Sequence, residues 1–207
     1  MKYLNYIVLS MIMSLVSTFA YAQGFEGRIV MMQYKGIEAP VQITWYIKGQ
    51  QLAYDIVFET PEGQTMNLRC IPRLETQQLR LKDVAGSFDY EVPVSSIEVE
   101  TDLKSVVNVQ TVAQTRSMKS NYKTLASLDV YHPSVSKTQV EYTTDVMIDW
   151  TKYADFFLND YALVAMAKEN IKGFPISSET KDASGNIIFK TEVTSIVATK
   201  ISDSIFE

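Results

Sequence analysis

The chain has 207 residues, 46% of them hydrophobic, and its 24 acidic side chains against 19 basic ones give a formal net charge of −5. This length suits one domain with a sizeable core, and the acidic balance leaves no basic surface of the kind that binds nucleic acid. The single cysteine (Cys70) and single histidine (His132) exclude an intrachain disulfide and a metal site built from a His/Cys cluster.

The first 22 residues are typical of a secretory signal peptide. A short basic region precedes an apolar run, residues 7–19, which is too short to span a bilayer, and Ala20-Tyr21-Ala22 fits a cleavage site. We therefore expect cleavage near Ala22–Gln23 and a periplasmic or secreted protein with one mature domain at residues 23–207. An uncleaved N-terminal anchor is the alternative. No later stretch is long and apolar enough to be a membrane span.

Residues 24–34 predict the first strand. Both of its sides are apolar, with Val30 and Met32 on one side and Ile29 and Met31 on the other. A strand with two apolar sides is expected to be covered on both, or to lie where a sheet curls.

Residues 41–70 predict three antiparallel strands joined by two tight turns. Apolar and polar side chains alternate along residues 41–48, as in a half-buried strand. Gly49-Gln50 suits a two-residue type II′ turn, and Pro61-Glu62-Gly63 suits a three-residue loop with a left-handed glycine. These turns pair Ile47 with Leu52, Trp45 with Tyr54, Ile43 with Ile56, Val41 with Phe58, Phe58 with Met66, Ile56 with Leu68, and Tyr54 with Cys70. The result is one apolar face of eleven residues, which another element must cover. Cys70 lies on this face and is expected to be a buried, inert thiol.

Residues 72–138 have weaker patterns. Pro72 is expected to end the third strand, and further short strands are predicted at residues 79–82, 88–92, 97–100 and 105–112. The basic residues between Arg116 and Lys123 are interpreted as a solvated loop, with contact to anionic headgroups as the alternative. His132, next to a proline, is interpreted as a surface residue.

The period of the apolar pattern changes after residue 148. Residues 140–148 alternate as a strand, whereas aromatic and aliphatic residues recur every three to four positions over residues 151–171. We predict a helix there, capped by Thr151 and stopped by Gly173. The tail predicts a hairpin with its turn at residues 182–186, and Phe206 as a final buried plug.

Together these elements predict a mainly β (α+β) fold: a curved antiparallel sheet or unclosed β-barrel with one main helix across its concave face. If the helix does not fill the concave side, aromatic residues of both elements would line a cavity. We name Trp45, Tyr54, Phe58, Phe157 and Tyr161 as candidate ligand-binding residues. The alternative for each of them is an ordinary place in the core.

Several short motifs resemble those of an uncharacterised family of exported bacterial proteins, chiefly from Bacteroidetes, known only as a domain of unknown function. They are Phe25-Glu26-Gly27, Tyr46-Ile47-Lys48-Gly49, Gly173-Phe174-Pro175-Ile176 and residues 201–206. That family is similar in turn to the Lol-type lipoprotein carriers. The resemblance implies an unclosed antiparallel barrel with a hydrophobic cavity and a periplasmic setting, but no catalytic residues and no lipoprotein cargo.

The sequence has no catalytic motif. A G-x-S-x-G elbow and a glycine-rich phosphate loop are both missing, so we expect neither an enzyme nor a cofactor. The leading hypothesis is an exported binding protein that carries or senses a lipid or other hydrophobic ligand. The alternative is a structural protein of the cell envelope with a filled core, which binds a partner protein through its sheet surface.

Overall fold

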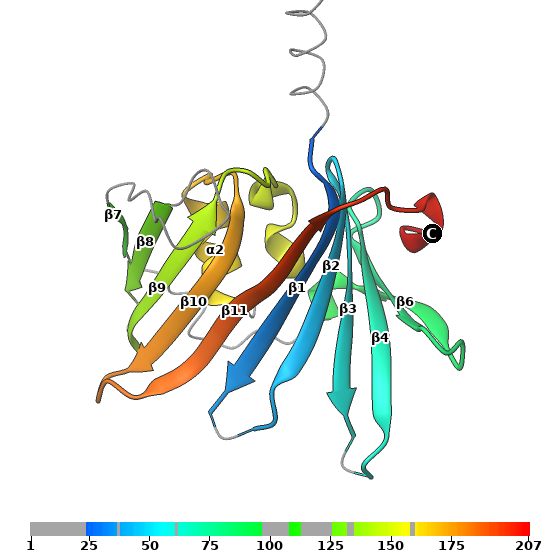
Figure 1. Ribbon diagram of the computed structural model, residues 1–207, viewed down its shortest axis with the longest axis horizontal. Coiled ribbons are helices and arrows are strands. Elements are labelled where there is room, and N and C mark those ends of the chain that lie inside the picture. The colour runs from blue at the N-terminus through cyan, green and yellow to red at the C-terminus, as the bar shows by residue number, and fades with distance from the viewer. Residues whose placement is uncertain are drawn as a thin grey trace, which may run out of the picture.

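The computed structural model describes residues 24–36, 38–60, 62–96, 108–112, 126–131, 135–157 and 160–207. It shows a curved antiparallel sheet with a short helical segment on one side, which confirms the predicted fold class (Figure 1). The proposed signal peptide, the basic stretch 116–123 and His132 lie outside the described residues.

Eleven strands of the described residues form one sheet. The first six are β1 (Glu26–Lys35), β2 (Val41–Lys48), β3 (Gln51–Glu59), β4 (Thr65–Arg73), β5 (Gln78–Asp83) and β6 (Asp89–Pro93), followed by the 3₁₀ turn η1 (Val94–Ser96). The last five are β7 (Asn108–Val112), β8 (Ala126–Tyr131), β9 (Val135–Thr143), β10 (Phe174–Asp182) and β11 (Ile187–Ala198). The helical segment consists of the 3₁₀ turns η3 (Trp150–Lys152) and η4 (Ala154–Phe156) and the helix α2 (Tyr161–Lys168), and a last turn, η5 (Asp203–Ile205), follows β11.

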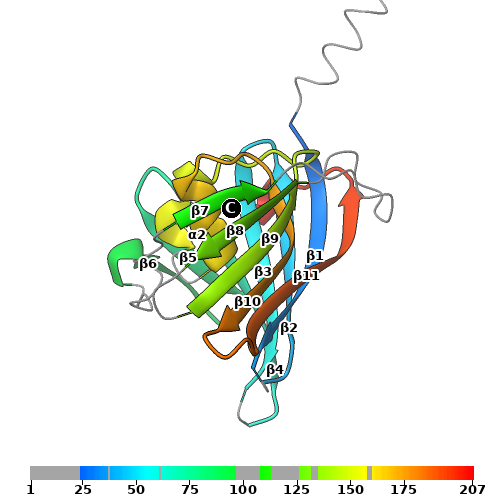
Figure 2. The same cartoon turned by 90° about the vertical axis from the view of Figure 1, so that its left-hand side faces the viewer.

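Two meanders make up the sheet. Its order is β6-β5-β4-β3-β2-β1-β11-β10-β9-β8-β7, so the first and last strands pair at its centre and join the two halves. Strands β6 and β7 form the two edges, and no ladder closes them into a barrel among the described residues. The sheet curls around the helical segment, which lies on the concave side (Figure 2).

The register predicted for the β2–β3–β4 meander is confirmed. Trp45 pairs with Tyr54 across the first turn, and Tyr54 pairs with Cys70 across the second. The β2–β3 ladder ends at Gln42 and Val57, one position short of the predicted Val41–Phe58 pair. Gly49 and Gly63 have φ angles of +61° and +76°, so each supplies the left-handed backbone that its turn requires.

The predicted helix over residues 151–171 is wrong in its extent. Trp150, Tyr153 and Phe156 are all buried and recur at a spacing of three, which matches the three-residue turn of a 3₁₀ helix and accounts for η3 and η4. The α-helix begins only after Asp160, whose side chain accepts a hydrogen bond from the Leu163 amide at 3.0 Å. Thr151 therefore lies inside a 3₁₀ turn and is not the cap.

Helix α2 also ends earlier than predicted. Asn170, rather than Gly173, takes the left-handed conformation after the last turn, with φ at +52°. The amide of Ile171 donates to the Met166 carbonyl at 2.8 Å and that of Asn170 to the Ala167 carbonyl at 3.1 Å, which is the Schellman pattern of helix ends. Asparagine is the residue that most readily replaces glycine at this position.

Three strand predictions also need correction. β4 continues through Pro72, which pairs with Leu79 of β5. Because Pro72 lies beyond the last β3–β4 pair, its missing amide proton costs no hydrogen bond to β3. β9 occupies Val135–Thr143, so residues 144–148 are outside it. β8 was not predicted. The hairpin of β10 and β11 is confirmed, as is the turn between them.

The C-terminal tail packs on the face of the sheet opposite the helical segment. Ile201 and Phe206 form a small buried cluster there with Ala53 and Ile71, which confirms Phe206 as a plug. The Arg73 guanidinium donates to the Phe206 carbonyl at 2.8 Å and holds the tail in place. The two faces of the sheet thus have separate cores, and the larger one lies under the helical segment.

Candidate functional site

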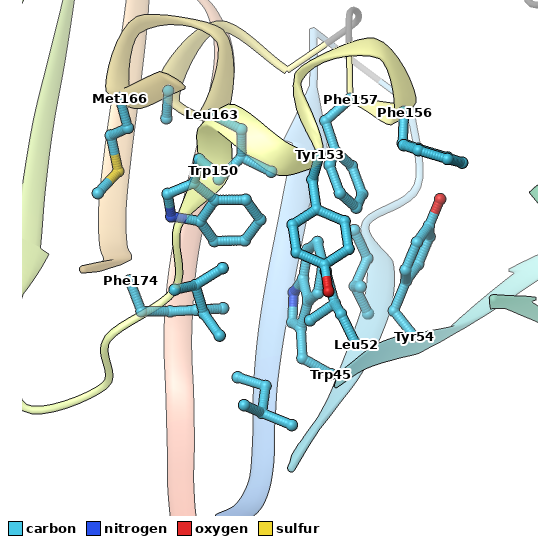
Figure 3. Packing of buried hydrophobic residues seen from close by; sticks show 14 of the residues in the cluster. Trp45, Leu52, Tyr54, Trp150, Tyr153, Phe156, Phe157, Leu163, Met166 and Phe174 are labelled. Carbon is cyan, nitrogen blue, oxygen red and sulfur yellow. The ribbon is translucent and has the colours of Figure 1, made fainter. Parts of the chain in front are cut away.

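An aromatic cluster joins the sheet to the helical segment. The rings of Tyr153 and Phe157 point from the segment toward Trp45 and Tyr54 on the sheet, and Phe156 packs beside Tyr153 (Figure 3). The Trp45 ring centroid lies 4.9 Å from that of Tyr54 and 5.5 Å from that of Phe157. The Tyr153 hydroxyl donates to the carbonyl of Gln50 in the β2–β3 turn, so the segment is fixed to the end of this hairpin.

A cavity of about 300 Å³ remains between the sheet and the segment. Its wall has five aromatic residues: Trp45, Tyr54, Phe156, Phe157 and Phe189. Four aliphatic residues complete the apolar part: Ile43, Ile56, Leu79 and Leu163. Its polar residues are Gln33 of β1 and Asp160. The volume lies at the lower end of the range for small-molecule sites, and a mainly apolar wall with few polar groups is typical of them.

The structure brings together three of the five candidate residues. Trp45, Tyr54 and Phe157 line the cavity directly. Tyr161 is buried one step away, with its ring centroid 6.5 Å from that of Phe189 in the cavity wall. Phe58 lies outside the cavity, in the groove described next. A ligand-binding role for these residues stays a prediction.

A groove of about 760 Å³ adjoins the cavity. The two share Gln33, Ile43 and Ile56 in their walls, and the groove continues over Val41 and Phe58 toward the ends of the strands. Together they form one hollow along the concave side of β2 and β3. Glu38 and Glu59 line its outer part.

Sequence reasoning missed Asp160 in the cavity wall. Burial among apolar groups raises the pKa of its carboxyl, against the smaller opposing effect of hydrogen bonds from the Leu163 and Ala162 amides. Phe189 was placed correctly in a strand but not in the site, because the pairing of β11 with β1 is non-local and has no local signal. For Asp160 a signal was present: an aspartate directly before an apolar run is typical of a helix cap.

The two tryptophans differ in how their indole nitrogens are satisfied. Trp150 Nε1 donates to the Gly173 carbonyl at 2.7 Å, which ties η3 to the start of β10. Trp45 Nε1 is buried and has no hydrogen-bond partner among the described residues. The rings of Trp150 and Phe174 lie nearly perpendicular to the Trp45 ring, both at 82°. A buried donor without a partner lowers the stability of the fold. A ligand with a hydrogen-bond acceptor at this position would restore that stability.

Cys70 is buried behind the cavity wall, as expected, and its thiol is hydrogen bonded to the Tyr54 hydroxyl. Burial raises the pKa of the thiol from its ordinary value of 9.0 to about 12. Because only the thiolate reacts, the reactive fraction is roughly a thousandfold lower than for a free cysteine.

We therefore expect iodoacetamide at pH 8 to label the native protein at least a hundredfold more slowly than the urea-unfolded protein. Intact mass measured against time gives both rates, and Cys70 is the only cysteine in the sequence. Similar rates in the two states would show that the thiol is accessible and that this wall opens readily.

The described residues offer little for other kinds of site. They contain no group of three or more His, Cys, Asp and Glu side chains placed to hold a metal ion. In the same part of the chain, no helix is long and apolar enough to cross a membrane. The hollow along β2 and β3, with its aromatic wall, is the candidate site.

No protein-family model and no curated protein matches the chain. Among solved structures, it is similar to an uncharacterized conserved protein from Thermus thermophilus, with 8% identity, a TM-score of 0.49, and coverage of 87% of this chain and 83% of the other. It is also similar to a chain of the Pseudomonas aeruginosa MucA/MucB complex, with 6% identity, a TM-score of 0.47, and coverage of 88% and 55%. For a LolA superfamily protein from Nitrosomonas europaea the identity is 9%, the TM-score 0.30, and the coverage 89% and 90%. Similarity at this level indicates neither a ligand nor a partner, and the resemblance to the uncharacterised exported family stays a prediction.

Proposed function

We propose that this protein is an exported, non-enzymatic binding protein that holds a lipid or other hydrophobic small molecule in the periplasm. The observation that carries the proposal is the aromatic-lined cavity between the sheet and the helical segment. The signal-like first 22 residues support the export. The adjoining groove extends the apolar surface, so an elongated ligand can lie along β2 and β3.

The alternative, an envelope protein that binds a partner through its sheet surface, predicts a filled interior and a continuous exposed apolar patch. The cavity counts against the filled interior. The large exposed apolar side chains of the described residues lie on β1, β6, β11 and two loops. They are Tyr34, Val84, Tyr90, Met147, Ile187 and Val197. The structure therefore favours the binding protein.

A cavity-filling substitution tests the proposal. Ile56 is only partly buried and lines both the cavity and the groove, so Ile56→Trp should fill the hollow without overpacking the core. We expect the wild-type protein to bind the apolar fluorophore N-phenyl-1-naphthylamine and the variant to bind it at least tenfold more weakly, a loss of about 1.4 kcal/mol. Fluorescence titration measures both affinities.

Val84→Trp provides the matched control. It adds the same indole to an exposed position in the β5–β6 turn, away from the cavity, and should leave the affinity unchanged. Thermal unfolding of both variants checks that they fold. Unchanged binding in Ile56→Trp, or no binding by the wild type, would contradict the proposal and leave the partner-binding alternative.

A further inference from the structure

We propose that the ligand carries a positively charged group of the alkylammonium class, held between the Asp160 carboxylate and the aromatic rings of the cavity, with its apolar chain in the groove along β2 and β3. This inference rests on the proposed function and names the chemical class of its ligand. Three features of the described residues support it: a carboxylate without a counter-charge in the wall, the aromatic rings that line the same cavity, and the absence of basic side chains in the linings of the hollow.

Asp160 has no cationic partner among the described residues. Its carboxylate accepts hydrogen bonds from amides of the first turn of α2, and the groups that affect its pKa include no lysine or arginine. Burial disfavours the charged carboxylate, as the raised pKa shows. A ligand cation beside it would supply the missing counter-charge, and two opposite charges attract more strongly in a site that excludes water than in bulk solvent.

The remaining cavity wall suits an ammonium group. Cations bind over the faces of aromatic rings within about 6 Å of the ring centre, and rings grouped around a pocket are the usual way to recognise quaternary ammonium ligands. Trp45, Tyr54 and Phe157 are packed against one another, with Tyr54 and Phe157 ring centroids 5.5 Å apart. Phe156 and Phe189 line the same cavity.

The charges along the hollow all have one sign. Its charged lining residues are Asp160 in the cavity and Glu38 and Glu59 in the groove, and neither lining includes a lysine or arginine among the described residues. Lys35 faces the same side at the end of β1, but it is exposed and lines neither space. An anionic headgroup would therefore be repelled in the hollow, whereas a cationic one would be attracted.

Asp160→Asn distinguishes binding of the charged headgroup from binding of the apolar chain. Asparagine caps helices as well as aspartate does, so the variant removes the charge and keeps α2. Isothermal titration at neutral pH compares octyltrimethylammonium with octyl glucoside, which have the same chain, below their micelle concentrations. We expect the wild type to bind the cation about tenfold more tightly than the glucoside. The variant should lose most of this preference without a change in its affinity for the glucoside.

Asp155→Asn is the matched control, because it removes an exposed carboxylate from η4 of the same segment and should change neither affinity. Phe189→Leu provides a second test that keeps all charges: loss of an aromatic face should weaken the cation about threefold and leave the glucoside unchanged.

The outcomes distinguish this inference from the proposed function. Equal binding of cation and glucoside by the wild type, or an unchanged preference in Asp160→Asn, would overturn the charged headgroup while the cavity still binds. Failure of both compounds to bind, together with no effect of Ile56→Trp on N-phenyl-1-naphthylamine, would overturn both the headgroup and the proposed function.

Discussion

Replacing Arg69 by methionine is expected to destabilise the protein by about 3 kcal/mol, because it leaves the Asp55 carboxylate buried without its counter-charge. Asp55 is only 4% exposed. Arg69 binds it with two hydrogen bonds, Nε to Oδ1 at 2.7 Å and Nη2 to Oδ2 at 2.9 Å. The Tyr46 hydroxyl donates to Oδ2 at 3.1 Å, and the guanidinium lies 5.3 Å from the Tyr46 ring centre. Arg69 keeps some solvent contact, which places the expected loss at the lower end for a broken buried pair.

The sheet contains its own control for this prediction. Arg80 and Asp89 form the same two-bonded geometry, at 2.8 and 2.7 Å, between β5 and β6 at the exposed edge. Arg80→Met breaks an equivalent pair that is in contact with water, so the loss in the free energy of unfolding should be much smaller. Urea unfolding of the two variants gives the comparison. Equal losses would mean that burial of Asp55 does not determine the strength of the Arg69 pair.

The strands of the central meander could be predicted because two independent signals agree there. Alternation along residues 41–48 assigns Trp45 to the apolar face, and the glycines at positions 49 and 63 fix the register of the next two strands. A shift of one residue would have moved Tyr54 to the other face. Trp45 and Tyr54 were therefore placed correctly as a cross-strand pair on the apolar face from the sequence alone.

The helical segment was harder to predict because its aromatic residues fit two periods. Tyr153 and Phe157 are four apart, as in an α-helix, whereas Trp150, Tyr153 and Phe156 are three apart, as in a 3₁₀ helix. The second pattern prevails where the chain packs on the sheet, and Asp160 then begins a separate helix. The missed carboxylate of the site follows from this error, since a helix starting at Thr151 gives Asp160 no capping role.

The pairing that completes the site leaves no local trace in the sequence. Phe189 of β11 reaches the cavity because β11 lies beside β1. It lines the cavity together with Gln33 of β1, and more than 150 residues separate the two in the sequence. Such contacts depend on how the two halves of the sheet meet, and period and turn chemistry describe each half alone. The sequence therefore indicated an apolar face covered by a helix, whereas the position of a charge beside that face required the assembled fold.

Trp150→Ala is expected to destabilise the protein by about 4 kcal/mol, in the range for truncating a buried tryptophan. The side chain is 1% exposed, and its ring centroid lies 5.7 Å from that of Phe157 and 6.0 Å from that of Phe174. Truncation leaves a void between the sheet and η3, and it also leaves the Gly173 carbonyl without its indole donor. Urea unfolding should show the full loss, whereas Tyr90→Ala, at a half-exposed aromatic, should change the stability little.

Trp150→Phe separates packing from hydrogen bonding at this position. Phenylalanine retains most of the ring contacts but not the donor, so we expect a loss of about 1–3 kcal/mol, the cost of a buried carbonyl without a partner. Because the helical segment that Trp150 anchors also holds Phe156 and Phe157 in the cavity wall, weakening this anchor should also loosen the wall. We expect the folded Trp150→Phe protein to bind N-phenyl-1-naphthylamine more weakly than the wild type, although no cavity residue is changed. Unchanged affinity would show that contacts of the segment other than the Gly173 bond suffice to hold the wall.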